Sequence, residues 1–148
     1  MPSGWHRLSR LPPEGHPPGL PKLFIDRSLG RLEVPRLLRD AGLDLVTLAE
    51  HYGMPADEDV EDVTWIADVA RHGWVALMKD ARIRRRPAER AAIQSNGTRC
   101  FCVPRADLPS AVMGERYLAN LGAMTTACQS PGPFLYAVHA HQLRAMPL

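Results

Sequence analysis

The sequence predicts an α/β domain with three layers, in which helices cover both faces of a central, mostly parallel sheet. Short apolar runs typical of strands alternate along the chain with segments whose apolar residues have helical spacing. Turn-forming Gly, Pro and Asn residues lie between these segments. Strands that alternate with helices usually lie parallel, with the helices packed on the two faces, so this pattern indicates the α/β class.

Length and composition favour one folded domain preceded by a leader. The 148 residues are 45% hydrophobic and 23% charged, ordinary values for a globular domain. The net charge of +2 is too small to indicate nucleic-acid binding by itself. Residues 1–21 are rich in Pro and Gly, so we expect a flexible N-terminal leader there and the folded domain over residues 22–148.

The sequence also bears on the compartment. No apolar stretch reaches the roughly 18 residues needed to span a bilayer, and the leader lacks the apolar centre of a signal peptide. The three cysteines, Cys100, Cys102 and Cys128, are odd in number and form no CxxC pair, which argues against a disulfide framework or a zinc ribbon. A reduced, cytoplasmic setting is therefore expected.

The first half of the chain is expected to contain two strands and one helix. The elements are a strand over residues 22–26, a helix over about 34–41, a strand over 43–48 and a loop over 50–61. Pro35 suits the first turn of the helix, and Gly42 suits its end. Gly53 breaks regular structure in the expected loop.

The second half is expected to continue the alternation. The elements are a helix over residues 62–72, a strand over 75–78, a helix over 87–93, a strand over 99–103, a helix over 110–128 and a strand over 134–139. Asp62 lies where it can cap the first of these helices, which ends at Gly73. Pro87 marks the start of the next helix.

Three aspartates occupy related positions in this pattern. Asp26 follows the first apolar strand, Asp80 follows the strand at residues 75–78, and Asp62 begins a helix. The carboxyl ends of parallel strands lie at one edge of a sheet, where ligands of open α/β sheets bind, so we expect the three carboxylates to converge there. A carboxylate at a buried strand end is costly unless a cation meets it.

The chemistry of these aspartates points to a hard divalent cation. Carboxylates with no neighbouring His or Cys suit Mg²⁺ or Mn²⁺ rather than zinc or copper, and water activated by such a cation can attack a phosphodiester. Ser28 is placed to orient Asp26, and Lys79 is placed to contact phosphates. Each aspartate alone has a simpler explanation as a helix cap or a turn residue, and the three together favour a site.

The charges are unevenly distributed around the predicted site. Acidic residues crowd residues 57–62, and arginines crowd the segment that follows the third strand. An acidic pocket beside a basic rim suits a metal-dependent phosphodiester enzyme, although two solvated charge runs explain the pattern equally well. The candidate RNA-binding residues of the basic rim are Arg82, Arg84, Arg85 and Arg86.

Two motifs of the chain resemble those of the PIN-like nucleases, especially the short PIN-like family that includes the VapC-type toxins of toxin–antitoxin pairs. Residues 24–28 are similar to the opening motif, an apolar strand followed by Asp, a variable residue and Ser or Thr. Residues 62–80 are similar to the later motif, with an acidic helix start, a Gly before the strand and an Asp after it. The resemblance covers about residues 22–103.

This resemblance implies a PIN-like three-layer fold and a ribonuclease that depends on Mg²⁺ or Mn²⁺ and is suppressed by a cognate antitoxin protein. Carried over by position, Asp26, Asp62 and Asp80 would be the catalytic, metal-binding acids. The chain departs from the family pattern at Met78, where Thr or Ser is usual. It also lacks a segment that carries a further acid in longer PIN domains. The candidate substitutes for that acid are Asp59 and Glu61, and Asp107, past the fourth strand, is a candidate for another ligand.

Other interpretations remain open at this stage. The chain can be a non-catalytic PIN-like binding module for RNA or protein if Met78 abolishes cleavage, or a phospho-receiver domain, which also uses aspartates at strand ends. His139 and His141 resemble a metal pair on one strand face, but no third ligand is close in the sequence. The apolar positions Leu118, Leu121 and Met124 either pack on the sheet or form the surface of a homodimer.

Overall fold

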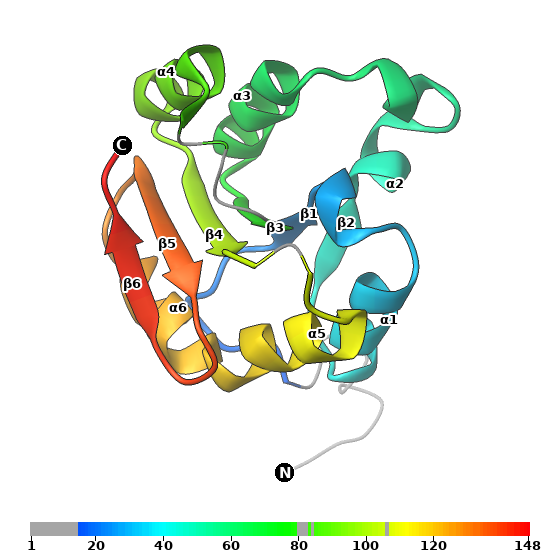
Figure 1. Ribbon diagram of the computed structural model, residues 1–148, viewed down its shortest axis with the longest axis vertical. Coiled ribbons are helices and arrows are strands. Elements are labelled where there is room, and N and C mark those ends of the chain that lie inside the picture. The colour runs from blue at the N-terminus through cyan, green and yellow to red at the C-terminus, as the bar shows by residue number, and fades with distance from the viewer. Residues whose placement is uncertain (1–14, 80–82, 84, 106) are drawn as a thin grey trace, which may run out of the picture.

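The computed structural model describes residues 15–79, 83, 85–105 and 107–148, which form a sheet between two layers of helices (Figure 1). The strands of the described chain are β1 (Leu23–Ile25), β2 (Leu45–Thr47), β3 (Val75–Lys79), β4 (Arg99–Val103), β5 (Phe134–Val138) and β6 (Leu143–Met146). Their order is β2-β1-β3-β4-β5-β6, and every neighbouring pair is parallel except β5 and β6. The predicted mostly parallel α/β sheet is confirmed.

The two helical layers pack on opposite faces of the sheet. The helices are α1 (Glu33–Asp40), α2 (Leu48–Tyr52), α3 (Asp62–His72), α4 (Pro87–Asn96), α5 (Ser110–Ala119) and α6 (Leu121–Ala127), with short 3-10 turns η2 (Arg27–Leu29) and η3 (Ala56–Asp59). In Figure 1, α3 and α4 lie above the sheet, and α1, α5 and α6 lie below it. Every helix of the described residues is too short or too polar to cross a bilayer.

The strands are apolar on both faces because each face meets a helical layer. Phe24 and Met78 pack in the cluster that contains Trp65 of α3 and residues of α4. Leu77 and its neighbours on the other face pack in the cluster that contains Tyr117 of α5 and residues of α1 and α6. Successive strand residues point to opposite faces, so continuous apolar runs mark central strands.

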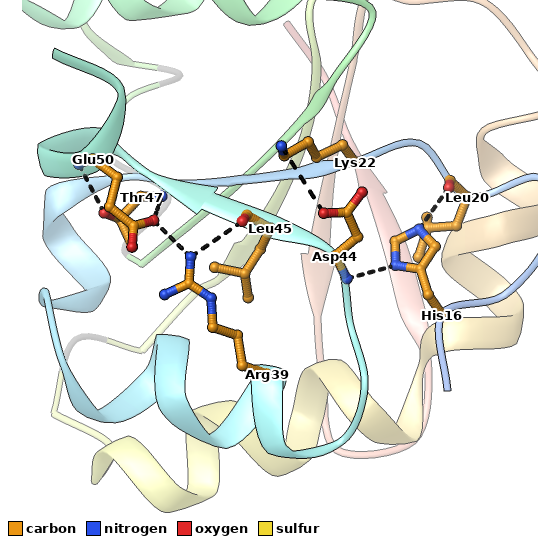
Figure 2. Close-up of polar contacts among 8 residues, drawn as sticks. All are labelled: His16, Leu20, Lys22, Arg39, Asp44, Leu45, Thr47 and Glu50. Carbon is orange, nitrogen blue, oxygen red and sulfur yellow. Dashed lines mark hydrogen bonds and ion pairs between the residues drawn. The ribbon is translucent and has the colours of Figure 1, made fainter. Parts of the chain in front are cut away.

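Residues 48–59 are more ordered than expected, and the predicted loop over 50–61 is wrong in its first part. Helix α2 begins directly after β2 because Thr47 and Glu50 form a reciprocal capping box. The Thr47 Oγ1 accepts from the Glu50 N–H at 3.1 Å, and the Glu50 Oε1 accepts from the Thr47 N–H at 2.9 Å (Figure 2). Arg39 of α1 also donates to Glu50 Oε1 at 2.6 Å, which ties α1 to α2. The Thr-x-x-Glu spacing was visible in the sequence, but the apolar run before it favoured a longer strand.

The C-terminal region differs from the prediction in two places. The helix expected over residues 110–128 is interrupted at Asn120, which is 2% exposed and donates from Nδ2 to the carbonyls of Arg116 and His139, each at 2.8 Å. After β5 the chain forms β6, an antiparallel edge strand over residues 143–146 that was not predicted. His139 and His141 lie in the connection between β5 and β6, so the expectation of a histidine pair on one strand is wrong.

Residues 15–21 were expected in the flexible leader but pack on the domain. His16 Nδ1 accepts from the Asp44 N–H at 3.0 Å and its Nε2 contacts the Leu20 carbonyl at 2.8 Å, so the ring bridges two segments (Figure 2). Leu20 is 5% exposed and joins the core cluster under α1 and α6. The Pro and Gly content indicated flexibility, but one histidine and one leucine anchor this segment. Residues 15–21 therefore belong to the packed domain.

His16→Ala is expected to lower the free energy of unfolding by about 1–2 kcal/mol, because two hydrogen bonds to backbone groups are lost. Urea denaturation followed by circular dichroism measures this loss. His141→Ala is the matched control, since His141 is exposed in the connection before β6. An equal effect of the two substitutions would show that His16 does not anchor residues 15–21.

Candidate active site at the carboxyl edge of the sheet

Asp26 lies at the carboxyl edge of the sheet, directly after β1, and is 7% exposed. Its backbone N–H donates to the Leu77 carbonyl of β3 at 3.0 Å, which continues the ladder between β1 and β3 to this residue. Ser28 links the same two strand ends, because its Oγ accepts from the Lys79 N–H at 3.0 Å. The backbone at the ends of β1 and β3 is therefore fixed where the first predicted carboxylate begins.

The two oxygens of the Asp26 carboxylate differ in their surroundings. Oδ2 accepts from Ser28 twice, from the hydroxyl at 2.8 Å and from the backbone N–H at 3.3 Å. Oδ1 is buried and has no hydrogen-bond partner among the described residues. Burial is the main cause that raises the Asp26 pKa above its ordinary value, and the charge of Asp62 raises it further, while the Ser28 hydrogen bonds oppose the shift. The site is therefore costly for an uncompensated negative charge.

Asp62 is the first residue of α3 and is half-buried. The cap position belongs to Glu61, so the expectation that Asp62 itself caps the helix is wrong by one residue. Its Oδ1 accepts from the indole Nε1 of Trp65 at 2.9 Å, and its Oδ2 lies 3.6 Å from Nη1 of Arg86. A carboxylate in the first turn of a helix is stabilised by the helix dipole.

The residues present fit a divalent cation at this edge. Asp26 offers a buried carboxylate oxygen that has no donor among the described residues, and the negative charge of Asp62 is one of the causes that raise the pKa of Asp26. Carboxylate oxygens are the hard donors that Mg²⁺ or Mn²⁺ prefers, and the ion pair of Asp62 with Arg86 at 3.6 Å leaves Oδ1 of Asp26 without a cation among the described residues. Asp80, the third predicted ligand, lies outside the described residues, and among those described no group of three or more His, Cys, Asp and Glu side chains could hold a metal ion.

A polar hollow of about 470 Å³ lies beside Asp62. The acids that line it are Glu58, Asp59, Glu61, Asp62 and Glu89, together with Arg27. Asp59 and Glu61, predicted as additional acids, are exposed along this hollow. Glu89 was not predicted, although its place in the first turn of α4, after Pro87, indicates a helix start that faces the same edge.

The remaining predicted residues differ in how they relate to the site. Asp107 is exposed and accepts from Arg105, whose Nη2 lies 2.9 Å from Oδ2, and this hydrogen bond lowers the pKa of Asp107. Asp107 is therefore paired away from the other acids. Arg82 and Arg84 lie outside the described residues, whereas Arg85 and Arg86 are exposed. Lys79 is half-buried at the end of β3.

Tyr117 supports the strand ends from below and was missed by the sequence analysis. Its hydroxyl donates to the Met78 carbonyl at 2.7 Å and lies 3.3 Å from the Phe101 carbonyl, so it touches both β3 and β4. Burial raises the Tyr117 pKa well above its ordinary value, so the hydroxyl remains protonated and a donor. The Met78 side chain, 1% exposed, packs in the core on the opposite face of the sheet.

Comparisons with known proteins agree with this architecture. The family model described as "PIN like domain" matches residues 21–105. A curated protein of Mycobacterium tuberculosis (strain H37Rv), named "Putative ribonuclease VapC45", is 48% identical over 124 residues, which cover 84% of this chain and 90% of the relative. No solved structure matches the chain significantly. The resemblance seen in the two sequence motifs is confirmed, and the chain belongs to the PIN-like domain family.

Proposed function

We propose that this chain is a metal-dependent endoribonuclease that hydrolyses RNA phosphodiester bonds and is the toxin of a type II toxin–antitoxin pair. The observation that carries the proposal is the buried, unpartnered Oδ1 of Asp26 at the carboxyl edge of the sheet, within electrostatic reach of Asp62. Membership of the PIN-like family and the ribonuclease name of the M. tuberculosis relative support it.

The proposed catalytic residues are Asp26, Asp62 and Asp80, which would hold Mg²⁺ or Mn²⁺. Such a cation, when bound, acidifies water and stabilises negative charge on a phosphodiester. Ser28 fixes the Asp26 carboxylate in one orientation through Oδ2 and leaves Oδ1 for ligation. Arg86, which lies 3.6 Å from Asp62, and the exposed Arg85 before it suit contacts to phosphates, as do Arg82, Arg84 and Lys79 by their sequence positions.

The proposal also names partners and a setting. RNA is the substrate, and a cognate antitoxin protein, encoded beside this chain, is the inhibitor expected from the VapC name of the relative. The place of action is the cytoplasm. Self-association into a homodimer is a further part of the proposal, and the mass of the purified protein by light scattering tests it.

Met78 favours a second candidate function. The family motif usually has a hydroxyl residue here, and the buried methionine supplies no polar atom at the end of β3. The second candidate is therefore a catalytically inactive PIN-like module that binds RNA or protein. The two functions differ in whether RNA is cut.

Cleavage of single-stranded RNA by the purified protein distinguishes them. We expect cleavage with Mg²⁺ or Mn²⁺, none with EDTA, and a loss of at least about 100-fold in Asp62→Asn and Asp80→Asn. Asp44→Asn is the matched control, because Asp44 pairs with Lys22 at the opposite edge of the sheet and is half-exposed. RNA that is bound but never cut would favour the second candidate. Equal cleavage by Asp80→Asn and the wild type would refute the proposed metal site.

A further inference from the structure

A second buried carboxylate lies close to the candidate site in the sequence and has no role in the proposed reaction. Asp57 of η3 is 4% exposed, whereas the acids that follow it, Glu58, Asp59 and Glu61, are exposed. Burial of a carboxylate is costly unless cationic donors meet it. The contacts of Asp57 therefore indicate what this carboxylate does.

Two arginines that follow Asp26 reach across to this segment. Arg31 donates from Nη2 to Asp57 Oδ2 at 3.0 Å, and Arg27 donates from Nη2 to the Asp57 carbonyl at 3.3 Å. Arg27 also donates to the carbonyl of Val60. We call the four residues Arg27, Arg31, Asp57 and Val60 the clasp.

The clasp joins the two chain segments that carry the described candidate ligands. Arg27 is adjacent to Asp26, and Val60 is two residues before Asp62. Between α2 and α3 the chain has only the four-residue turn η3, so no strand ladder fixes this connection. The contacts of Arg27 and Arg31 therefore restrict where α3 begins relative to the end of β1.

The geometry of Arg31 argues for a constraint on position. A paired charge gains little stability once its desolvation is counted, and removal of one partner leaves the other uncompensated. What the pair supplies is a link between two loops, a single charge-assisted hydrogen bond from Arg31 Nη2 to Asp57 Oδ2, while Oδ1 of Asp57 has no partner among the described residues. Gly30, with φ of 86°, turns the chain so that Arg31 faces η3 rather than continuing the preceding turn.

We infer that Asp57 and Arg31 are positioning residues that set the spacing between the Asp26 and Asp62 carboxylates for a shared divalent cation. We assign neither residue as a ligand, although Oδ1 of Asp57 has no hydrogen-bond partner among the described residues. This inference rests on the proposed function, because it assigns the pair a role at the same metal site. It predicts that the affinity for the cation depends on a pair whose members touch neither carboxylate.

The experiment measures Mn²⁺ affinity by isothermal titration calorimetry on the purified full-length chain. Asp57→Asn and Arg31→Gln are each expected to weaken Mn²⁺ binding by about 10-fold, as substitutions that support metal ligands usually do. The double variant should bind Mn²⁺ no more weakly than whichever single variant has the lower affinity, because both substitutions break the same link. Arg31 is half-exposed, so Arg31→Gln tests the inference even if Asp57→Asn does not fold.

Asp68→Asn is the matched control. The Asp68 side chain is 14% exposed and accepts from Arg71 and Tyr52, so it is also a largely buried carboxylate bonded to an arginine. It lies in the second half of α3, away from the clasp. We expect Asp68→Asn to lower the melting temperature and leave Mn²⁺ affinity within about twofold of the wild type.

The outcomes separate the two proposals. Wild-type affinity in Arg31→Gln overturns the positioning role and leaves the proposed function standing. A loss of affinity in Asp68→Asn equal to that in the clasp variants also overturns it, because general destabilisation would then explain both. A wild-type chain that binds no Mn²⁺ overturns the proposed function together with this inference.

Discussion

Asp26→Asn is expected to abolish Mn²⁺ binding, reduce RNA cleavage by at least about 100-fold and stabilise the cation-free protein by about 1 kcal/mol. The amide keeps the shape of the side chain and can still accept from Ser28, but it removes a buried negative charge that Asp62 repels. Calorimetric titration with Mn²⁺ and urea unfolding in EDTA measure the two opposite effects. A variant that loses activity and is also less stable would contradict this account, because Asp26 would then support the fold.

The contribution of Asp26 to the free energy of unfolding changes with pH in a defined direction. Burial raises the pKa of Asp26 in the folded state, so the folded protein keeps this proton at pH values where the unfolded chain has released it. The stability that Asp26 contributes is therefore present below the ordinary carboxyl pKa and is lost as pH rises through the raised one. The difference in unfolding free energy between Asp26→Asn and the wild type should grow across this interval and then level off. A constant difference would show that the charge of Asp26 is not the cause.

Trp65→Ala is expected to lower the free energy of unfolding by about 3–5 kcal/mol, the largest effect on stability that we predict for a single substitution. Trp65 is 0% exposed and stacks on Phe24 with ring centroids 5.5 Å apart. It belongs to the core cluster between α3 and the sheet. Urea denaturation measures the free energy of unfolding. If the purified variant aggregates, its melting temperature in the cell lysate is compared with that of the wild type.

Two further substitutions interpret the result for Trp65. Trp65→Phe retains most of the packing, so it should lower the free energy of unfolding less than Trp65→Ala does. It also removes the indole donor to Asp62, so it should still alter Mn²⁺ affinity. Trp74→Ala is the matched tryptophan control, because Trp74 is half-exposed beside His72. If Trp74→Ala and Trp65→Ala destabilise equally, burial of Trp65 in the core is not what sets its contribution.

The parts of the fold that depend on local patterns could be predicted from the sequence. The apolar runs at residues 23–25 and 75–78 predicted strands, and the alternation of strands with helices predicted their parallel order. The same reasoning placed Asp26 at the carboxyl edge. The link between Asp26 and Ser28 spans two residues, so it was also accessible from the motif.

The parts that depend on contacts between distant segments could not be predicted. Asp57 and Arg31 are 26 positions apart, and nothing in an acidic run distinguishes the one member that is buried. In the sequence Tyr117 has the spacing of an ordinary apolar helix residue, and only the fold shows that its hydroxyl reaches the end of β3. Asn120 interrupts a helical pattern, and its side chain donates to the carbonyl of His139, 19 positions away. In each case the chemistry was visible, but its partner was set by the tertiary fold.

The indole of Trp65 donates to a carboxylate that we assign to the cation site. Indole emission shifts when the charge near the ring changes, so occupancy of the site should be readable from intrinsic fluorescence without any label. In a chain carrying Trp5→Phe and Trp74→Phe, the remaining signal would come from Trp65 alone. The fluorescence of Trp65 would therefore report cation binding, and stopped-flow mixing would measure its rate.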